Sequence, residues 1–145
     1  MTRVLVDSDV LVAALVGRHP RHVEANALLA RVERGELGLL VATHALAEVY
    51  ATLSVYPGRP RLTPAEVERL IAERVVGPAE VVALDGADYV AVLARVAGLG
   101  LVSGAVYDAL HVRAAEKAGA DELVTFNGRD FRRFPPAAPT QLVVL

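Results

Sequence analysis

Short apolar runs that alternate with longer segments of helical periodicity constrain the fold of this chain more than any other feature. The first run, residues 3–6, is rich in valine and leucine and ends at Asp7, as expected of a buried central strand. Parallel strands need crossover connections that return over the sheet, so the alternation predicts an α/β fold. We expect a five-stranded, mostly parallel sheet that is covered by helices on both faces.

The expected elements follow from periodicity and from turn and cap residues. Thr43, Thr63 and Ser103 are the predicted N-caps of three helices. The predicted strands are residues 3–6, 39–42, 80–84, 123–126 and 141–145. The predicted helices, with their caps, are residues 9–16, 20–34, 43–53, 63–76, 86–98, 103–119 and 129–134.

The composition limits the class of protein. A length of 145 residues, of which 54% are hydrophobic, suits one domain with a single core. Without cysteine there can be no disulfide, thiolate metal site or cysteine nucleophile, which leaves carboxylates and four histidines as candidate ligands. No apolar stretch approaches the roughly 20 residues of a membrane span, and the first residues lack the pattern of a secretory signal. We therefore expect a cytoplasmic protein that does not enter a membrane.

Charge gives a weaker indication. A net charge of −2 argues neither for nor against a nucleic-acid partner. Lys117 is the one lysine among 15 basic residues; arginine suits bidentate contacts with phosphate, although a GC-rich genome produces the same bias. Aromatic residues make up 5% of the chain and offer little for base stacking, so a bound RNA would be held by its backbone in a cleft.

Acidic and amide side chains gather where the carboxyl ends of the predicted strands meet. Ligands of such sheets bind at this edge, where the strand order reverses. Carboxylates gathered there would repel one another unless a cation were bound, and oxygen ligands select hard cations such as Mg²⁺ or Mn²⁺. Such a cation can activate water and stabilise the charge that develops on a phosphodiester during in-line attack. The residues concerned are Asp7, Asp9, Glu48, Asp108, Asn127 and Asp130.

Four segments, in this order, resemble the motifs of one family, the PIN domain, and in particular the VapC-like toxins of toxin–antitoxin pairs. Residues 4–11 resemble the strand-Asp-x-(Asn/Asp) opening of the family, and residues 42–49 resemble its glutamate-bearing helix. Residues 107–112 are similar to the third acidic motif, and residues 123–131 to the last. The likeness covers nearly the whole chain, so it implies a single PIN domain over residues 1–145, with a three-layer α/β/α fold.

The resemblance also implies which residues carry the chemistry. Asp7, Glu48 and Asp108 would bind Mg²⁺ or Mn²⁺, directly or through water, for the attack of water on an RNA phosphodiester. Many family members have aspartate where this chain has Asn127, which supplies no negative charge, and Asp130 is the candidate to replace it. The expected catalytic and metal-binding residues are thus Asp7, Glu48, Asp108 and Asp130. The residues expected to position ligands or water are Asp9, Thr125 and Asn127.

Partners follow from the same resemblance. It implies an endoribonuclease toxin that forms a homodimer and is neutralised by a small antitoxin, which would occupy the groove and the helices after the second strand. The candidates for contacts with RNA phosphates are Arg129, Arg132 and Arg133, for which plain surface charge is the alternative.

Each acidic residue also has a simpler interpretation. Asp7 could cap the helix that follows it, and Glu48 could belong to a solvated helix face. Asp130 could be only the acidic residue of a first helical turn. Asp108 lies among small residues, where a partly buried acid is harder to explain without a function.

The histidines are not assigned to the site. His111 lies one turn after Asp108, and a lone histidine at that spacing is more often structural or exposed. His19 and His22 flank a helix start without a matching pair elsewhere, which argues against a zinc site.

Two other functions compete with the nuclease. Residues 7–9, Asp-Ser-Asp, also resemble the nucleophile and acid of haloacid-dehalogenase-like phosphatases, but that chemistry wants a lysine beyond a later strand, and Lys117 lies inside a helix near its end. A non-catalytic PIN-like module that only binds protein or RNA is the other alternative, and the acidic cluster argues against it. Nucleotide binding through a glycine-rich phosphate loop is not supported, since neither of the common motifs is present.

Overall fold

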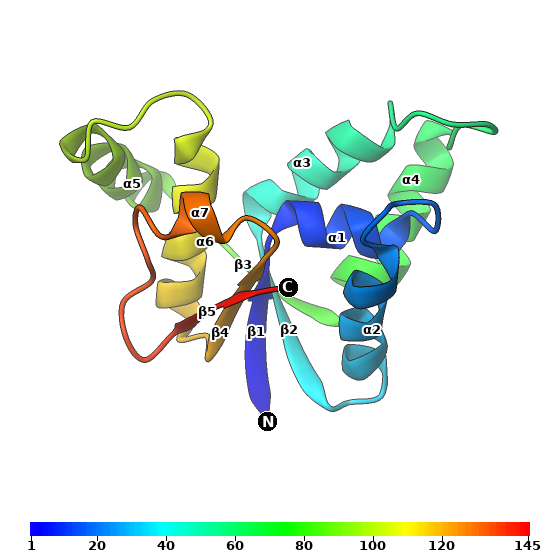
Figure 1. The fold of residues 1–145 in the computed structure, drawn as a ribbon, viewed down its shortest axis with the longest axis horizontal. Helices are drawn as coiled ribbons and strands as arrows, with labels where there is room; N and C mark the ends of the chain where they lie inside the picture. Colours follow the sequence, from blue (N-terminus) through cyan, green and yellow to red (C-terminus); the bar gives the residue numbers. More distant parts are fainter.

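A sheet of five strands, each parallel to its neighbours, forms the centre of the computed structural model, which describes residues 1–145 (Figure 1). The strands lie in the order β3-β2-β1-β4-β5, so the predicted five-stranded α/β sheet is confirmed and is parallel throughout. The strands are β1 (Thr2–Val6), β2 (Leu37–Ala42), β3 (Ala79–Val82), β4 (Glu122–Thr125) and β5 (Gln141–Val144).

Helices cover both faces of this sheet, as predicted. The helices α1 to α4 pack on one face and α5 to α7 on the other, at the right and the left of Figure 1. The helices are α1 (Ser8–Leu15), α2 (His22–Glu33), α3 (Thr43–Leu53), α4 (Pro64–Ile71), α5 (Gly86–Gly98), α6 (Ala105–Ala118) and α7 (Gly128–Phe131), and α4 continues as the π-helix η1 (Ala72–Val76). None of them combines the length and apolar character that crossing a bilayer requires.

The alternation of side chains along β1 explains why this strand is central. Val4 and Val6 belong to the core beneath α1 to α4, whereas Leu5 points to the opposite face and packs with α5 to α7. All three side chains are fully buried. A continuous apolar run is what a strand covered on both faces requires, which is why the run before Asp7 predicted it correctly.

Two of the three predicted helix caps are wrong. Thr43 is the first residue of α3 rather than its cap, and its Oγ1 accepts a hydrogen bond from the backbone N–H of Leu84, 3.3 Å away. Ser103 has φ of +54°, so it does not adopt the extended backbone of an N-cap, and Gly104 precedes α6. Thr63 caps α4 as predicted, in a reciprocal pair of hydrogen bonds with Glu66.

A network of charges fastens α5 to α6. Asp88 in α5 is 3% exposed and accepts hydrogen bonds from Nζ of Lys117 at 2.6 Å and from Nε of Arg113 at 2.9 Å, both in α6. Lys117 holds the pKa of the Asp88 carboxyl well below its usual range. The network fixes α6, the helix that carries Asp108 and His111.

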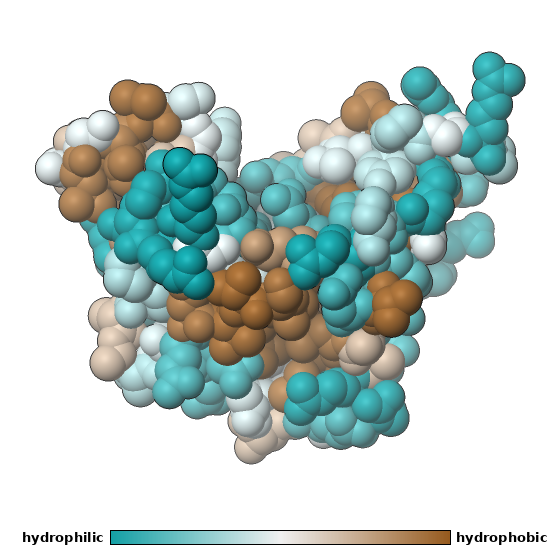
Figure 2. Space-filling view, in the orientation of Figure 1, coloured by the Kyte–Doolittle hydropathy of each residue, from teal (hydrophilic) through white to brown (hydrophobic).

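The strand order places the reversal point next to β1. The chain proceeds outward from β1 to β2 and β3, and then returns to add β4 and β5 on the other side of β1. In such sheets the carboxyl ends of the two strands at the reversal form the usual ligand site. Here these ends carry Asp7 and Thr125. Figure 2 shows the molecule hollowed between two groups of helices above this edge.

Candidate active site

Asp7 lies at the centre of the candidate site. Its backbone N–H donates to the carbonyl of Val124 at 3.0 Å, which continues the pairing of β1 with β4 by one residue. Its side chain makes no capping hydrogen bond to α1, although Asp7 occupies the N-cap position. Instead, its Oδ2 accepts a hydrogen bond from Oγ1 of Thr125 at 2.8 Å, and its Oδ1 lies 3.3 Å from Nε2 of His111. Asp7 therefore occupies the predicted N-cap position, but its side chain is engaged elsewhere.

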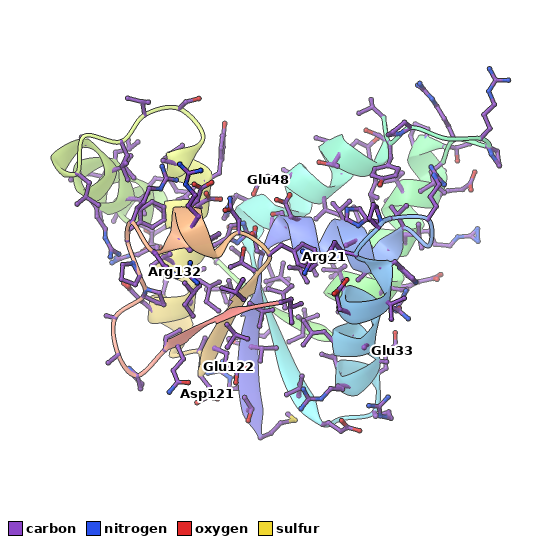
Figure 3. The ribbon with its side chains drawn as sticks, viewed as in Figure 1. Arg21, Glu33, Glu48, Asp121, Glu122 and Arg132 are labelled. Carbon is purple, nitrogen blue, oxygen red and sulfur yellow. The ribbon has the colours of Figure 1, made fainter.

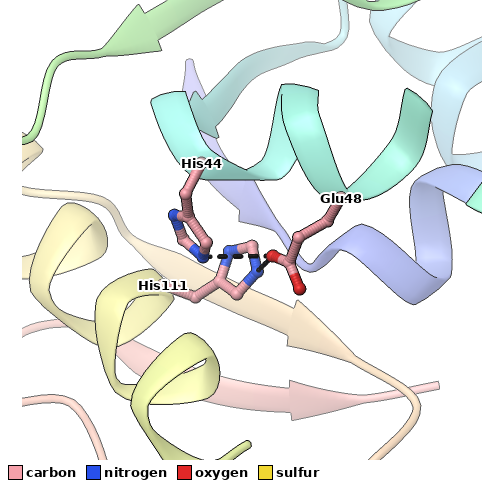
Figure 4. Close-up of side chains that lie close together, drawn as sticks. All are labelled: His44, Glu48 and His111. Carbon is pink, nitrogen blue, oxygen red and sulfur yellow. Dashed lines mark ion pairs between the residues drawn. The ribbon is translucent and has the colours of Figure 1, made fainter. Parts of the chain in front are cut away.

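Two side chains of α3 lie beside His111 of α6. His44 and Glu48 are four residues apart, so they lie on the same face of the helix, one turn from each other (Figure 4). Nε2 of His44 lies 3.2 Å from Oε1 of Glu48, and Oγ of Ser8 donates to the same oxygen at 2.9 Å. Glu48 is 33% exposed at its side chain, and Figure 3 shows it above the sheet, between the two groups of helices. It is thus a fixed, half-buried carboxylate rather than part of a freely solvated face.

His111 in α6 connects these residues. Its Nε2 lies 3.1 Å from Oγ of Ser8, 3.3 Å from Oδ1 of Asp7 and 3.4 Å from Oε1 of Glu48. The side chain is 1% exposed. The structure therefore places His111 in the middle of the site, although the sequence argument left it out.

The electrostatics of this cluster follow from its contacts. Burial alone would lower the pKa of His111, but the carboxylates of Glu48 and Asp7 outweigh burial and raise that pKa. Burial and the neighbouring His111 lower the pKa of His44 to about 4. Burial opposes the charged form of Glu48, yet its contacts with His111 and Ser8 lower its pKa on balance. The arrangement favours one charged imidazole, that of His111, between carboxylates.

The pKa values of Asp108 and Asp9 are raised, in contrast to that of Glu48. Burial and the negative charges of Asp7 and Asp130 raise the pKa of Asp108 to about 6. Desolvation and the charges of Asp7 and Glu48 also raise the pKa of Asp9. These carboxyl groups thus face concentrated negative charge, which a bound cation would neutralise.

The turn after β4 brings in the last two predicted residues. The backbone N–H of Asn127 donates to Oγ1 of Thr125 at 3.0 Å, and Oδ1 of Asn127 caps the short helix α7. The side-chain amide of Asn127 donates to Oδ2 of Asp130. Arg133 lies 3.7 Å from Asp130 and 3.9 Å from Asp108, and so connects the segment after α7 with α6.

The three arginines near this turn differ in their surroundings. The guanidinium group of Arg133 lies among the carboxylates of the site, with its side chain 35% exposed. Arg132 packs over Gly128, where an added Cβ would lie 3.1 Å from its Nη2. Arg129 is exposed. Arg133 is therefore the arginine that could contact a phosphate next to the carboxylates.

The chemistry of the donor atoms fits a divalent cation. Asp7, Asp108 and Glu48 offer carboxylate oxygens from three elements, and the raised pKa of Asp108 reflects charge that a cation would offset. One set of three side chains brings its ligand atoms within 4.8 Å of one another, and it consists of His44, Glu48 and His111. Of the predicted ligands, this set includes Glu48 alone, so the structure does not bring the four predicted carboxylates together as one such set.

Helical spacing carried a signal for the two missed histidines. His44 precedes Glu48 by four residues, and His111 follows Asp108 by three, so each histidine shares a helix face with a predicted ligand. Ser8 stands between two predicted aspartates in sequence, and nothing in the sequence indicates which partner its hydroxyl would bind. Spacing shows which residues share one face of a helix. It does not show that these faces of α3 and α6 meet, because that contact depends on the complete fold.

Comparison with known proteins identifies the family. The PIN domain model matches residues 4–135. Ribonuclease VapC27 of Mycobacterium tuberculosis is 36% identical over 124 residues, which are 86% of this chain and 84% of the relative. Among solved structures, VapC20 of M. tuberculosis, described as a sarcin-ricin loop cleaving toxin, has a TM-score of 0.72 at 17% identity and covers 90% of this chain and 95% of its own. The toxin–antitoxin complex from Klebsiella pneumoniae has a TM-score of 0.65 at 18% identity, over 97% and 96% of the two chains.

These likenesses agree with the fold. The matched residues include Asp7, Glu48, Asp108 and Asp130. The chain belongs to the PIN-domain family and is related within it to the VapC ribonucleases.

Proposed function

We propose that the chain is an endoribonuclease that hydrolyses RNA phosphodiesters with Mg²⁺ or Mn²⁺, and that it acts as the toxin of a toxin–antitoxin pair. The observation that carries the proposal is Asp7, a buried carboxylate at the reversal point that caps no helix and is held by Thr125. The relative at 36% identity is named a ribonuclease. Both point to phosphodiester chemistry at this edge of the sheet.

Asp7, Glu48 and Asp108 would hold the cation, with Asp130 as the fourth acid. A divalent cation at this place supplies Lewis acidity, which lowers the pKa of an attacking water and offsets charge on the phosphodiester. Thr125 fixes the orientation of Asp7 through its 2.8 Å hydrogen bond. Asn127 positions Asp130 and, together with Asp9 at the rim, is proposed to orient water.

The other residues of the site hold Glu48 and the substrate. Ser8 and His44 contact one oxygen of Glu48, which keeps that carboxylate turned toward Asp7. Arg133, two residues after the end of α7, reaches the carboxylates and is proposed to contact an RNA phosphate. A cleft that holds the RNA by its backbone agrees with the scarcity of aromatic side chains.

The phosphatase alternative loses its support in the structure. Its chemistry needs a free lysine beside the first aspartate, whereas Lys117 donates to Asp88 at 2.6 Å and to the carbonyl of Ala83 at 2.8 Å. Those contacts lie in the network between α5 and α6. They engage the one lysine of the chain away from Asp7.

We propose a homodimer and an antitoxin as partners. Large apolar side chains are exposed along α5 and the segment after it, with Val90 at 67%, Leu93 at 55% and Val102 at 80% exposure. Figure 2 shows apolar surface over α5, at the upper left. A patch of this kind on a water-facing helix suits a protein partner. Sedimentation of the purified protein, beside a Leu93→Glu variant, tests whether this surface pairs two copies.

Incubation of the purified protein with structured and unstructured RNA tests the activity. Cleavage is expected with Mg²⁺ or Mn²⁺ and is expected to stop on addition of a chelator. Cleavage that persists in the chelator would contradict the proposed mechanism. A non-catalytic PIN-like module would leave every RNA intact under all these conditions.

A further inference from the structure

Three ligand atoms converge at one side of the candidate site. Nε2 of His44 and Nε2 of His111 lie 3.2 Å and 3.4 Å from Oε1 of Glu48, and all three atoms lie within 4.8 Å of one another (Figure 4). Metal–nitrogen bonds of about 2.0–2.1 Å in tetrahedral geometry place ligand atoms about 3.3–3.4 Å apart. Two of the three spacings therefore already match those around a tetrahedral ion.

The histidines differ from ordinary core histidines. The Nδ1 atoms of both rings are buried and have no hydrogen-bond partner. Buried polar atoms are normally paired, so the two Nδ1 atoms are exceptions. The Nε2 atoms do have neighbours in the protein: that of His44 lies 3.1 Å from the carbonyl oxygen of Tyr107, and that of His111 lies 3.1 Å from Oγ of Ser8. What the two rings share is an Nε2 that points to one oxygen of Glu48, from two different helices. Their ring centroids are 4.3 Å apart.

The place is closed toward the protein and open on one side. The side chains of His44 and His111 are 7% and 1% exposed, whereas that of Glu48 is 33% exposed. An ion can therefore approach past Glu48 and meet both nitrogens in a partly dehydrated position, where it replaces the proton on Nε2 of His111, which is released to solvent. Oδ1 of Asp7, 3.3 Å from Nε2 of His111, is a further carboxylate oxygen that could complete the coordination.

We propose that His44, His111 and Glu48 form a nitrogen-containing site for a transition-metal ion, with Zn²⁺ or Co²⁺ favoured over Mg²⁺. Imidazole nitrogen suits Zn²⁺ and similar ions, whereas Mg²⁺ prefers an all-oxygen environment and retains water. The site shares Glu48 with the carboxylates of the proposed nuclease. An ion held by the histidines therefore withdraws Glu48 from the Mg²⁺ site and inhibits cleavage. Only this effect on cleavage rests on the proposed function.

A titration with Co²⁺ tests the binding directly. Bound Co²⁺ is expected to give a visible absorption band typical of few, nitrogen-containing ligands, and Zn²⁺ is expected to displace it while Mg²⁺ at the same concentration does not. His44→Gln is expected to weaken Co²⁺ binding by more than about 10-fold, the lower end of what losing even an indirect supporting contact costs at metal sites. His22→Gln is the matched control, because His22 lies at the start of α2 and contacts the carbonyl of Ala13.

Unchanged Co²⁺ affinity in His44→Gln, or an equal loss in His22→Gln, would overturn the proposal. His111 is fully buried, so its substitution can unfold the chain, and the unsubstituted protein provides a second measurement. Proton NMR of the Co²⁺-loaded protein is expected to show two strongly shifted, exchangeable imidazole N–H signals. A loaded protein without such signals has no histidine ligands and contradicts the site.

The two proposals can fail separately. Co²⁺ binding is measured without RNA, and RNA cleavage is measured with Mg²⁺ alone. Binding through His44 in a protein that cleaves no RNA would support this site and contradict the proposed nuclease. Cleavage in Mg²⁺ with no histidine-dependent binding of Co²⁺ or Zn²⁺ would support the nuclease and overturn this site.

Discussion

Thr125 at the end of β4 donates a hydrogen bond of 2.8 Å from its Oγ1 to Oδ2 of Asp7, the first residue after β1. The same hydroxyl oxygen accepts a hydrogen bond from the backbone N–H of Asn127 at 3.0 Å. Thr125 is fully buried, so both contacts form away from solvent. One hydroxyl thus links the two strands at the reversal point and starts the turn that carries Asp130.

Replacement of this hydroxyl should affect both stability and activity. Thr125→Val keeps the shape but leaves Asp7 and the N–H of Asn127 without a partner, so we expect the free energy of unfolding to fall by about 1–3 kcal/mol. Cleavage should also slow, because Asp7 loses its orientation. Thr125→Ser retains the hydroxyl and serves as the control. Urea unfolding and RNA cleavage assays that found Thr125→Val equal to Thr125→Ser would contradict this role.

Asp108→Asn should stabilise the metal-free protein at neutral pH. The charges facing Asp108 are Asp7 after β1, Asp130 and Arg133 at α7, and His111 on its own helix, and the pKa of Asp108 is raised to about 6. A carboxyl whose folded pKa lies above its unfolded value is uncharged in the native state at low pH. Stability is then lost as the pH rises from about 4 to about 6.

At pH 7.5, in a chelator, we expect Asp108→Asn to unfold with a free energy higher by on the order of 2 kcal/mol, and below pH 4 the two proteins should be equal. Thermal unfolding across this pH range measures the difference. Added Mn²⁺ should reverse the order, because the cation stabilises the protein that binds it more tightly. An asparagine variant that is less stable at pH 7.5 in chelator would show that Asp108 is not under repulsion.

Two variants distinguish a residue that supports a cation ligand from the ligand itself. Ser8→Ala removes a contact to Glu48, whereas Glu48→Gln removes the proposed ligand. Ser8 supplies one of the contacts to Oε1 of Glu48, so its loss should lower Mn²⁺ affinity or cleavage by about 10-fold. Glu48→Gln removes a proposed ligand and should cost at least about 100-fold. Calorimetric titration with Mn²⁺ and steady-state cleavage provide the two measurements. If Ser8→Ala were the more damaging change, Glu48 would not be a cation ligand.

Arg133→Gln should weaken RNA binding through the loss of one phosphate contact. Its guanidinium group lies 3.7–3.9 Å from Asp130 and Asp108, two of the proposed cation ligands. The slope of log K against log salt for single-stranded RNA should fall by about 0.7. Arg31→Gln is the control, because Arg31 pairs with Glu36 at the far end of α2. If the slope were the same in both variants, Arg133 would have only a structural role and would make no contact with an RNA phosphate.

Much of the fold could be predicted because local patterns determine it. The apolar run before Asp7 is buried on both faces, and the Thr63–Glu66 pair forms the expected cap of α4. The predicted caps at Thr43 and Ser103 are wrong, and for Ser103 the backbone, with φ of +54°, is not that of an N-cap. Thr43 uses its hydroxyl for the N–H of Leu84, a contact across 41 residues of chain.

The candidate site was predictable in its place but not in its contacts. Asp7 directly follows β1 and Thr125 ends the neighbouring parallel strand β4, so their meeting follows from the topology. His44 comes from α3 and His111 from α6, two helices that pack on opposite faces of the sheet. Their rings meet only in the folded chain. Pattern and spacing identify which face of each helix is polar, whereas the distance between two faces depends on packing.

The most direct measurement is cleavage of a defined RNA in Mn²⁺ by the unsubstituted protein, by Asp7→Asn and by Glu33→Gln. Glu33 is a control acid on α2, away from Glu48 (Figure 3), where it pairs with Arg74. We predict cleavage by the unsubstituted protein and by Glu33→Gln at similar rates, with product ends that lack a 2′,3′-cyclic phosphate, because water attacks rather than the ribose hydroxyl. Asp7→Asn should be at least about 100-fold slower. Equal cleavage by Asp7→Asn and Glu33→Gln would contradict a catalytic site centred on Asp7.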